Sequence, residues 1–256
     1  LVANVRFRPT RDPLTAGLAF AVEWPDSLQT NTAYDLLALR ASPRPNPAID
    51  ARRLDYALAH VTLGDAGYRL GALGSRYVTV SVERGHLADA WYNRFAIEAE
   101  YALPVFNRRR LIPASLHLHL TAATSTGRLP LQRQGMVDAR LGPYTPFGAL
   151  RTLGGRPYVG DRHLGLFWEQ SLRTLPFEAL GLYGLARRGY SILLHGGHAR
   201  TWLSHDEDAA DFRVPDEFHH EVGVSLSGLL GVIRIDFSTR LDAPGFGVGV
   251  AVARLF

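Results

Sequence analysis

The chain ends in Ile233–Phe256, IRIDFSTRLDAPGFGVGVAVARLF, the stretch that decides the predicted fold. In its first half, Ile233, Ile235 and Phe237 alternate with polar residues. After a short Asp-Ala-Pro-Gly turn at 242–245, apolar residues again occupy every second position: Phe246, Val248, Val250 and Val252. Because successive side chains of a β-strand point to opposite faces, the stretch predicts two strands, each with one apolar face.

The last residue, Phe256, closes the second of these strands with an aromatic ring. An aromatic residue at the end of an alternating strand is typical of bacterial outer-membrane β-barrels, whose strands face lipid on one side and the barrel interior on the other. We therefore interpret Phe246, Val248, Val250, Val252 and Phe256 as a C-terminal barrel signal. It predicts that lipid, rather than a packed protein core, covers the apolar face.

The same period of two recurs along the whole chain and predicts an all-β fold, an antiparallel transmembrane β-barrel with about twelve strands. The segment 174–188 has the only plausible helical pattern. Tryptophan and tyrosine at expected strand ends (Trp24, Tyr77, Tyr101, Trp168, Trp202) fit the aromatic girdles of such barrels. The expected strands are Leu1–Arg8, Ala16–Trp24, Ala33–Ser42, Arg53–Leu63, Tyr77–Glu83, Arg94–Tyr101, Ser115–Thr121, Arg162–Leu172, Tyr190–Leu203, His219–Gly228, Val232–Asp242 and Phe246–Phe256.

The amino-acid composition excludes several classes of protein. The 256 residues are 46% hydrophobic and 20% charged, which excludes a disordered chain. No run approaches the ~18 consecutive apolar residues of a membrane-spanning helix. The chain contains no cysteine, so disulfides, thiol catalysis and thiolate metal sites are excluded. Its pI is about 9.6, but the arginines are spread along strand-like segments instead of clustering, so we do not expect nucleic-acid binding.

A soluble β-sandwich is the main alternative fold, because its strands also alternate between apolar and polar residues. Two features favour the barrel. The expected strands and turns are long for a sandwich, and the polar faces carry small residues and charges of both signs, as in a water-filled interior. The chain begins at Leu1 without Met or a signal peptide, which predicts a processed or truncated piece of a longer precursor whose N-terminal domains are missing.

The alternation breaks between about 125 and 161, where we expect a long loop inserted into the barrel lumen. A connection of this length in a compact domain is usually functional. It ends in a run of small, basic and aromatic residues, Phe147–Arg162, followed by the strand-like segment 164–169.

These segments resemble the outer-membrane assembly insertases and two-partner secretion transporters, and more closely a family of Bacteroidota outer-membrane proteins of undefined function. That family joins a carboxypeptidase-regulatory-like N-terminal module to such a barrel. The resemblance covers about the last half of the chain and implies a barrel of sixteen strands, five of them after Asp161. The fragments that carry it are Gly127–Pro130, Phe147, Tyr158, Gly160–His163, Leu166–Glu169, Val222–Val224, Ile233–Phe237, Arg240-Leu241 and Phe256.

The resemblance implies a network in which Arg151, Gly160, Asp161 and Glu169 hold the loop against the inner wall. Two positions depart from the superfamily pattern. In the superfamily a glycine follows the loop arginine, whereas here Arg151 is followed by Thr152. The insertases also have an arginine two residues after the strand glutamate, whereas here Glu169 is followed by Gln170 and Ser171. Buried charges are retained only when they are paired, so we expect Arg151, Asp161 and Glu169 to pair.

The spacing of histidine, glutamate and serine residues gives little support for a metal site or a catalytic site. Histidines two residues apart on one strand, such as His117 and His119, can share a metal ion, and His195, His198, His219 and His220 follow in later strands. No carboxylate spacing completes such a site, so we predict no metal and no cofactor. Glu98 and Glu100 could serve as an acid–base pair, but no serine motif marks a nucleophile. We predict no catalytic residues and no enzyme.

Three functions remain open. The first is an outer-membrane barrel that acts in protein insertion, export or envelope assembly. Its partners would be outer-membrane lipid or lipopolysaccharide, other envelope proteins and unfolded clients. The second is a passive channel or a structural barrel subunit of a larger envelope complex, with the loop as a constriction. The third is a soluble β-sandwich binding module. The first two predict location in the bacterial outer membrane.

Overall fold

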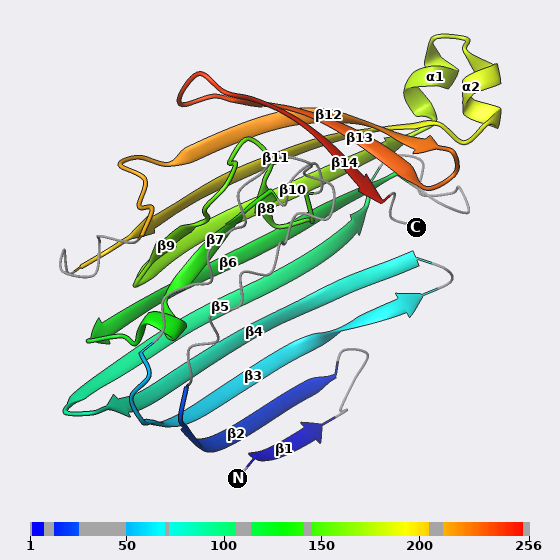
Figure 1. Ribbon diagram of the computed structural model, residues 1–256. Coiled ribbons are helices and arrows are strands. Elements are labelled where there is room, and N and C mark those ends of the chain that lie inside the picture. Colours follow the sequence, from blue (N-terminus) through cyan, green and yellow to red (C-terminus); the bar gives the residue numbers. More distant parts are fainter. Residues whose placement is uncertain are drawn as a thin grey trace.

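A single large antiparallel sheet dominates the computed structural model, which describes residues 2–7, 13–25, 50–69, 72–105, 114–140, 145–204 and 212–252. Within these residues eleven strands join in the order β1-β2-β3-β4-β5-β6-β10-β11-β12-β13-β14 (Figure 1). Chain neighbours are therefore sheet neighbours, and the segment between β6 and β10 leaves the sheet. The strands are β1 Val2–Phe7, β2 Leu14–Glu23, β3 Leu54–Arg69, β4 Ala72–Leu87, β5 Ala90–Pro104, β6 Ser115–Gly127, β10 Arg162–Arg173, β11 Ser191–Trp202, β12 His219–Leu229, β13 Ile233–Arg240 and β14 Phe246–Val252.

Eleven of the predicted strands are confirmed, and the twelfth, Ala33–Ser42, lies outside the described residues. The prediction of five strands after Asp161 is also confirmed. A connection leaves the large sheet at the place of the loop predicted at about 125–161, with two differences. β6 extends to Gly127, because Thr124–Gly127 continue to pair with β5, and the connection begins at 128. The connection also contains short regular elements that the sequence pattern did not indicate, namely the 3-10 helix η1 and the strands β7, β8 and β9.

These short elements form a layer of their own against one side of the large sheet (Figure 1). η1 spans Leu131–Arg133, β7 Gly135–Ala139, β8 Ala149–Leu150 and β9 Tyr158–Gly160. β7 is the centre of a three-stranded sheet, parallel to β8 and antiparallel to β9. We call the side of the large sheet that this layer covers the inner face, and the opposite side the outer face.

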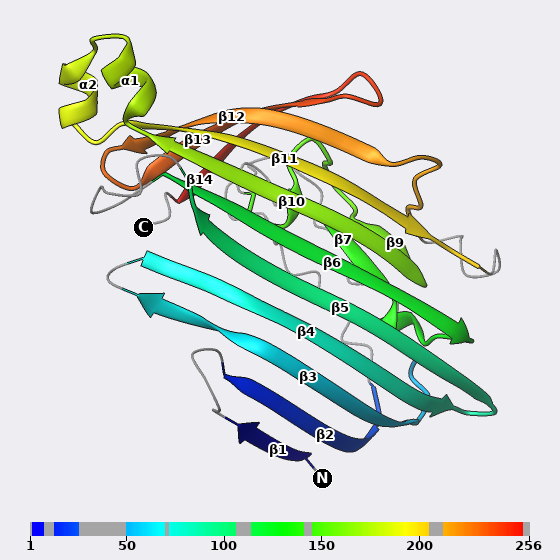
Figure 2. The same cartoon turned by 180° about the vertical axis from the view of Figure 1, so that it is seen from behind.

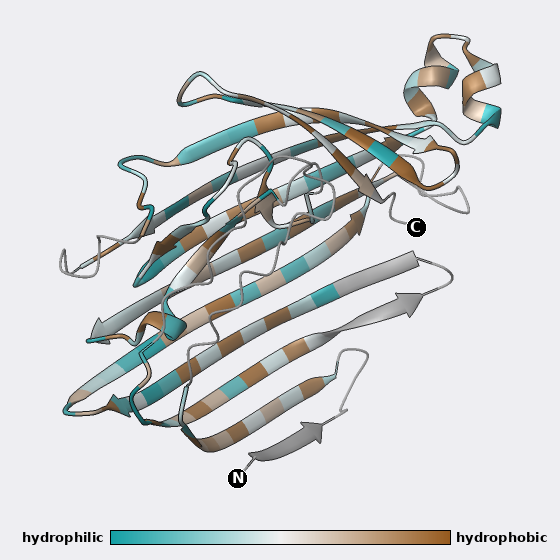
Figure 3. Cartoon of the chain, in the orientation of Figure 1, coloured by the Kyte–Doolittle hydropathy of each residue, from teal (hydrophilic) through white to brown (hydrophobic). Residues whose placement is uncertain are grey.

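Burial is inverted relative to a soluble sheet, because the charged side of the strands is covered and the apolar side is exposed. In β10, Glu169 is 1% exposed on the inner face, whereas Leu166 is 40% exposed on the outer face. Figure 3 shows this alternation of hydrophobic and hydrophilic residues along the strands. Other exposed outer-face residues are Leu18, Phe20, Val22, Val61, Val78, Val80, Val82, Phe95, Leu164, Val224, Phe237, Val248 and Val250.

The apolar clusters among the described residues lie where the inner layer meets the sheet. One combines Val137, Leu150, Leu153 and Tyr158 of the connection with Phe167 of β10 and Ala199 of β11. The other packs Leu129 against Leu54, Leu87 and Tyr92. In a soluble sandwich Phe20 and Val250 would be sealed between two sheets, but they are 52% and 43% exposed. The view from behind in Figure 2 looks onto this outer side of β6, β10 and β11.

The predicted helical region is confirmed: α1, Leu175–Ala179, and α2, Tyr183–Arg187, form the connection between β10 and β11. Among the described residues, no helix has the length and hydropathy needed to cross a membrane.

The two ends of the large sheet differ in their connections. The strand ends that are joined by residues 24–53, 88–89, 128–161, 203–218 and 241–245 meet at one end of the sheet. We call it the long-loop end, because the two longest connections, 24–53 and 128–161, join strands there. The connections at the opposite end are 8–13, 70–71, 105–114, 174–190 and 230–232. Trp24, Trp91 and Trp202 lie within two residues of strand ends at the long-loop end. The prediction that Trp168 marks a strand end is wrong, because it pairs with Gly196 and Leu118 in the middle of β10.

Candidate functional site: an arginine network on the inner face

Arg151, in the connection just after β8, lies at the centre of a buried ion-pair network. Its Nη2 lies 2.6 Å from Oε1 of Glu169 on β10, and its Nε lies 3.2 Å from Oδ2 of Asp236 on β13. All three side chains are at most 3% exposed. A single side chain of the connection thus joins two strands that are not neighbours in the sheet.

A second arginine, Arg234 of β13, completes the network. Its Nη2 lies 3.0 Å from Glu169 Oε1 and its Nε 2.8 Å from Asp236 Oδ1. Two guanidinium groups therefore face two carboxylates, and the formal charges cancel. Because an isolated charge is very costly to bury, this balance allows the four groups to stay ionised away from water.

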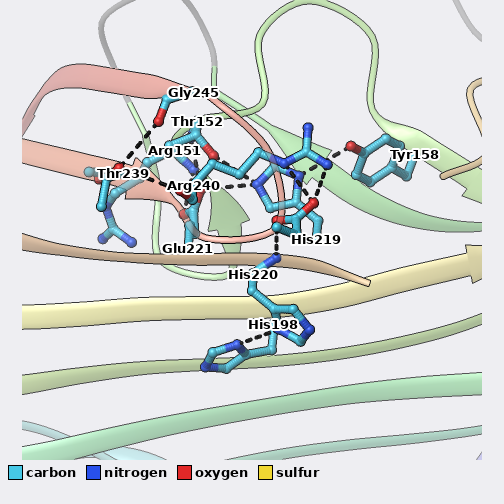
Figure 4. A network of polar contacts seen from close by, with 12 residues as sticks. Arg151, Thr152, Tyr158, His198, His219, His220, Glu221, Thr239, Arg240 and Gly245 are labelled. Carbon is cyan, nitrogen blue, oxygen red and sulfur yellow. Dashed lines mark hydrogen bonds and ion pairs between the residues drawn. The ribbon is translucent and has the colours of Figure 1, made fainter. Parts of the chain in front are cut away.

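Glu221 of β12 holds the backbone of the same segment. Its carboxylate accepts hydrogen bonds from the backbone N–H of Arg151 at 2.7 Å, the backbone N–H of Thr152 at 2.8 Å and the Thr152 hydroxyl at 2.6 Å. His219 bonds to the Thr152 hydroxyl through Nε2 and to the Tyr158 hydroxyl through Nδ1, at 2.7 and 3.2 Å. Figure 4 shows Arg151, Thr152, Tyr158 and His219 converging from the connection and β12.

The backbone of Arg151 lies directly on Gly247 of β14. A Cβ added at Gly247 would be 2.6 Å from the Arg151 carbonyl oxygen, closer than van der Waals contact permits. The glycine that follows Phe246 in the predicted barrel signal therefore makes room for the connection on the inner face. Sequence alternation indicates that residue 247 faces inward, but it cannot reveal what lies against it.

We expect Gly247→Ala to destabilise the protein by about 1–3 kcal/mol, because the added methyl group overpacks this contact. The temperature at which the folded form disappears in gel-mobility assays should fall. Gly184→Ala is the control, since a Cβ there meets nothing within 4 Å. Equal temperatures for the two variants would contradict the close approach of Arg151 to β14.

Gly160 and Asp161 lie in a separate group, not in the Arg151 network. Asp161 Oδ2 accepts the backbone N–H of Ser204, and its backbone carbonyl accepts the Ser125 hydroxyl, both at 3.0 Å. A Cβ added at Gly160 would overlap the Trp202 carbonyl oxygen. Through these contacts, Gly160 and Asp161 hold the last residues of the connection against β6 on one side and the end of β11 on the other. The expectation that Asp161 pairs within the same network as Arg151 and Glu169 is wrong, since its ion-pair partner is Arg162 at 3.6 Å.

A second arginine of the connection, Arg133 of η1, binds the other half of the sheet. It forms ion pairs with Glu23 of β2 at 3.0 Å and Glu83 of β4 at 3.1 Å, and its guanidinium lies 4.5 Å from the centre of the Tyr56 ring. Burial alone would lower the pKa of Arg133, but the charges of Glu83 and then Glu23 outweigh it, so its pKa is raised. Sequence reasoning missed this anchor; the only signal was that Glu23 and Glu83 occupy polar positions of alternating strands.

The histidines divide between the two faces. His117, His119, His195 and His219 lie on the inner face, and His198 and His220 on the outer face. His195 bonds to Ser225 and Ser238 at 3.0 and 2.9 Å, so it joins β11 to β12 and β13. Among the described residues, no three His, Asp or Glu side chains converge as metal ligands.

The remaining predicted residues take separate places. Glu98 accepts a hydrogen bond from Tyr77 at 2.7 Å. In the predicted barrel signal, Phe246, Val248 and Val250 are exposed on the outer face, Val252 ends β14, and Phe256 lies outside the described residues. The groups described above are ion pairs and hydrogen bonds that hold segments of the chain together. Comparison of the sequence with protein-family models and with curated proteins finds no match.

Proposed function

We propose that this chain is an outer-membrane β-barrel domain related to the assembly insertases and translocators, acting in insertion, export or envelope assembly. The inverted burial of the sheet carries the proposal. Exposed valine, leucine and phenylalanine on the outer face suit lipid, and the ionised side chains face an interior. In water, an apolar surface that extends over most of the strands would drive aggregation.

The inner layer supports a role beyond that of a simple membrane anchor. The connection carries Arg133 at its start and Arg151 past its middle, and these arginines bind opposite halves of the sheet. It therefore spans the inner face from β2 and β4 to β10 and β13. In a barrel, a segment in this position controls what enters the lumen.

The second candidate function, a passive channel or structural subunit, is favoured by the same anchoring. A segment tied by buried ion pairs on both sides is suited to act as a fixed constriction. If so, Arg151→Ala should increase single-channel conductance in planar bilayers, whereas Arg128→Ala, at an exposed position of the connection, should not. Conductance that does not change on Arg151→Ala would contradict a constriction formed by this segment.

Deletion of the chain from the bacterium that produces it separates the two functions. An assembly or export role predicts that other barrel proteins decline in the outer-membrane fraction, and that the unsubstituted chain restores them. Unchanged levels of those proteins would contradict the assembly role and leave the channel. Recovery of the chain itself in the aqueous fraction, without heat-modifiable gel mobility, would contradict both.

A further inference from the structure

Six aromatic and basic side chains gather on the outer face toward the long-loop end. They come from β10, β11, the start of β12 and the residue just before it. We call them the rim cluster: Trp168, His198, Arg200, Trp202, Phe218 and His220. In Figure 4, His198 and His220 project away from the group formed by Thr152, Tyr158 and His219. None of the six belongs to the inner-face network.

Hydrogen bonding fixes which nitrogens of the two histidines carry protons. The Trp168 indole N–H can only donate, and it lies 3.4 Å from His198 Nε2, which must accept. A neutral His198 then carries its proton on Nδ1 and donates it to His220 Nδ1, 2.9 Å away. His220 in turn carries its proton on Nε2. Among the described residues no acceptor meets this N–H, so the chain of bonds ends in an unused donor.

Among the described residues, Arg200 supplies a second donor without an acceptor, near the Nε2–H of His220. Its guanidinium carbon lies 5.2 Å from the centre of the Trp202 ring and 5.9 Å from that of Phe218. The His220 ring stacks on Phe218 at 5.8 Å between centroids. Arg200 Nε is buried without a hydrogen-bond partner, and no described carboxylate forms an ion pair with this arginine. A cation and a neutral N–H donor thus lie against the same phenylalanine, and within the part of the chain that the structure describes neither has an acceptor.

Stacking of arginine on tryptophan recurs along this rim. Arg53 lies 5.9 Å from the Trp24 ring centre and Arg84 5.0 Å from that of Trp91, both at the long-loop end. Tryptophan favours the interface between membrane and water, and the longer loops of outer-membrane barrels face outward from the cell. With the proposed function, the rim lies at the headgroups of the outer leaflet, where phosphate is the abundant acceptor.

We propose that the rim cluster binds a phosphate group of the lipid A part of lipopolysaccharide in the outer leaflet. This inference rests on the proposed location of the chain in the outer membrane. The planar guanidinium of Arg200 can donate two parallel hydrogen bonds to phosphate oxygens, and His220 Nε2–H adds a third donor. Trp168, farther from the rim, and the exposed Val224 then face the acyl chains.

The test measures binding of lipid A to the folded chain in detergent micelles by native mass spectrometry. Lipid A with both phosphates is compared with its dephosphorylated form, which keeps the acyl chains. Removing the phosphates, or removing the Arg200 side chain in Arg200→Ala, should raise the apparent Kd for lipid A by about tenfold. This is the loss of affinity expected when a charge-assisted hydrogen bond is removed. His220→Phe keeps the ring and removes the donor, and should give a smaller loss. Arg53→Ala is the matched control, since Arg53 also stacks on a tryptophan but already pairs with Asp55 at 2.9 Å.

Equal binding of the two lipid forms, or equal binding by Arg200→Ala protein that keeps heat-modifiable mobility, would overturn the phosphate site and leave the barrel proposal intact. Failure of the unsubstituted chain to form a heat-modifiable barrel in micelles would overturn both. A loss of binding as large in Arg53→Ala as in Arg200→Ala would also count against a defined site, since it would indicate a response to net charge alone.

Discussion

Arg151→Ala is expected to lower the free energy of unfolding by about 3–5 kcal/mol, the cost of leaving a buried charge without its partner. The variant retains Arg234 opposite two carboxylates, Glu169 and Asp236, so one negative charge stays buried and uncompensated. Denaturant titration of the chain folded in vesicles measures the loss. Protease cleavage within the connection should also become faster, because the tie between the connection and β10 and β13 is gone.

Two further variants show whether charge or geometry is responsible. Arg151→Lys restores the charge, but a single ammonium group does not reproduce the fork that reaches two carboxylates, so we expect partial recovery. Arg128→Ala removes an exposed arginine of the same connection and should leave stability and cleavage unchanged. If Arg151→Ala and Arg128→Ala gave the same unfolding curve, the network would not hold the connection.

Glu221→Gln is expected to have the second-largest effect, about 2–3 kcal/mol, because an amide cannot accept all three hydrogen bonds that the carboxylate accepts. One end of the amide would place N–H groups against the N–H or O–H donors of Arg151 and Thr152. Hydrogen exchange of the Arg151 and Thr152 backbone amides should become faster, since Glu221 is their acceptor.

Thr152→Val provides the graded comparison, as it preserves shape and removes only the hydroxyl. Its bonds to Glu221 and His219 would be lost, at a cost of about 1 kcal/mol, while both backbone bonds to Glu221 persist. Exchange at the two amides should then be close to that of the unsubstituted chain. Slow exchange in Glu221→Gln would show that Glu221 does not anchor this backbone.

The strand pattern was predictable because the period of two is a local property of the sequence. The alternation of Ile233, Ile235 and Phe237 indicates a strand without knowledge of its neighbours. An odd spacing along a strand likewise assigns His195 and His198, three residues apart, to opposite faces. The elements within the connection were not predictable in this way. β7, β8 and β9 are at most five residues long, too short for a period of two to stand out in the sequence.

The candidate site was predictable in part. The resemblance pointed to Arg151 and Glu169, 18 residues apart, and the structure places them in an ion pair. Asp236 and Glu221 lie 85 and 70 residues from Arg151, and no local pattern in the sequence indicates that the connection lies against β12 and β13. Asp161 looked equivalent to Glu169 in sequence, but it ends the connection before β10 and bonds to Ser204 instead. The departure at Thr152 became meaningful only when its hydroxyl was seen to reach Glu221 and His219.

The most direct test of the account measures which solvent meets each face of β4. The chain has no cysteine, so single cysteines at 78, 79, 80, 81 and 82 can each carry a nitroxide spin label in vesicle-reconstituted protein. Collision with oxygen, which concentrates in lipid, should dominate at 78, 80 and 82, where Val78, Val80 and Val82 are exposed. Collision with a water-soluble nickel complex should dominate at 79 and 81. Absence of alternation, or shielding of 78, 80 and 82 from both reagents, would contradict a sheet whose apolar face is covered by lipid.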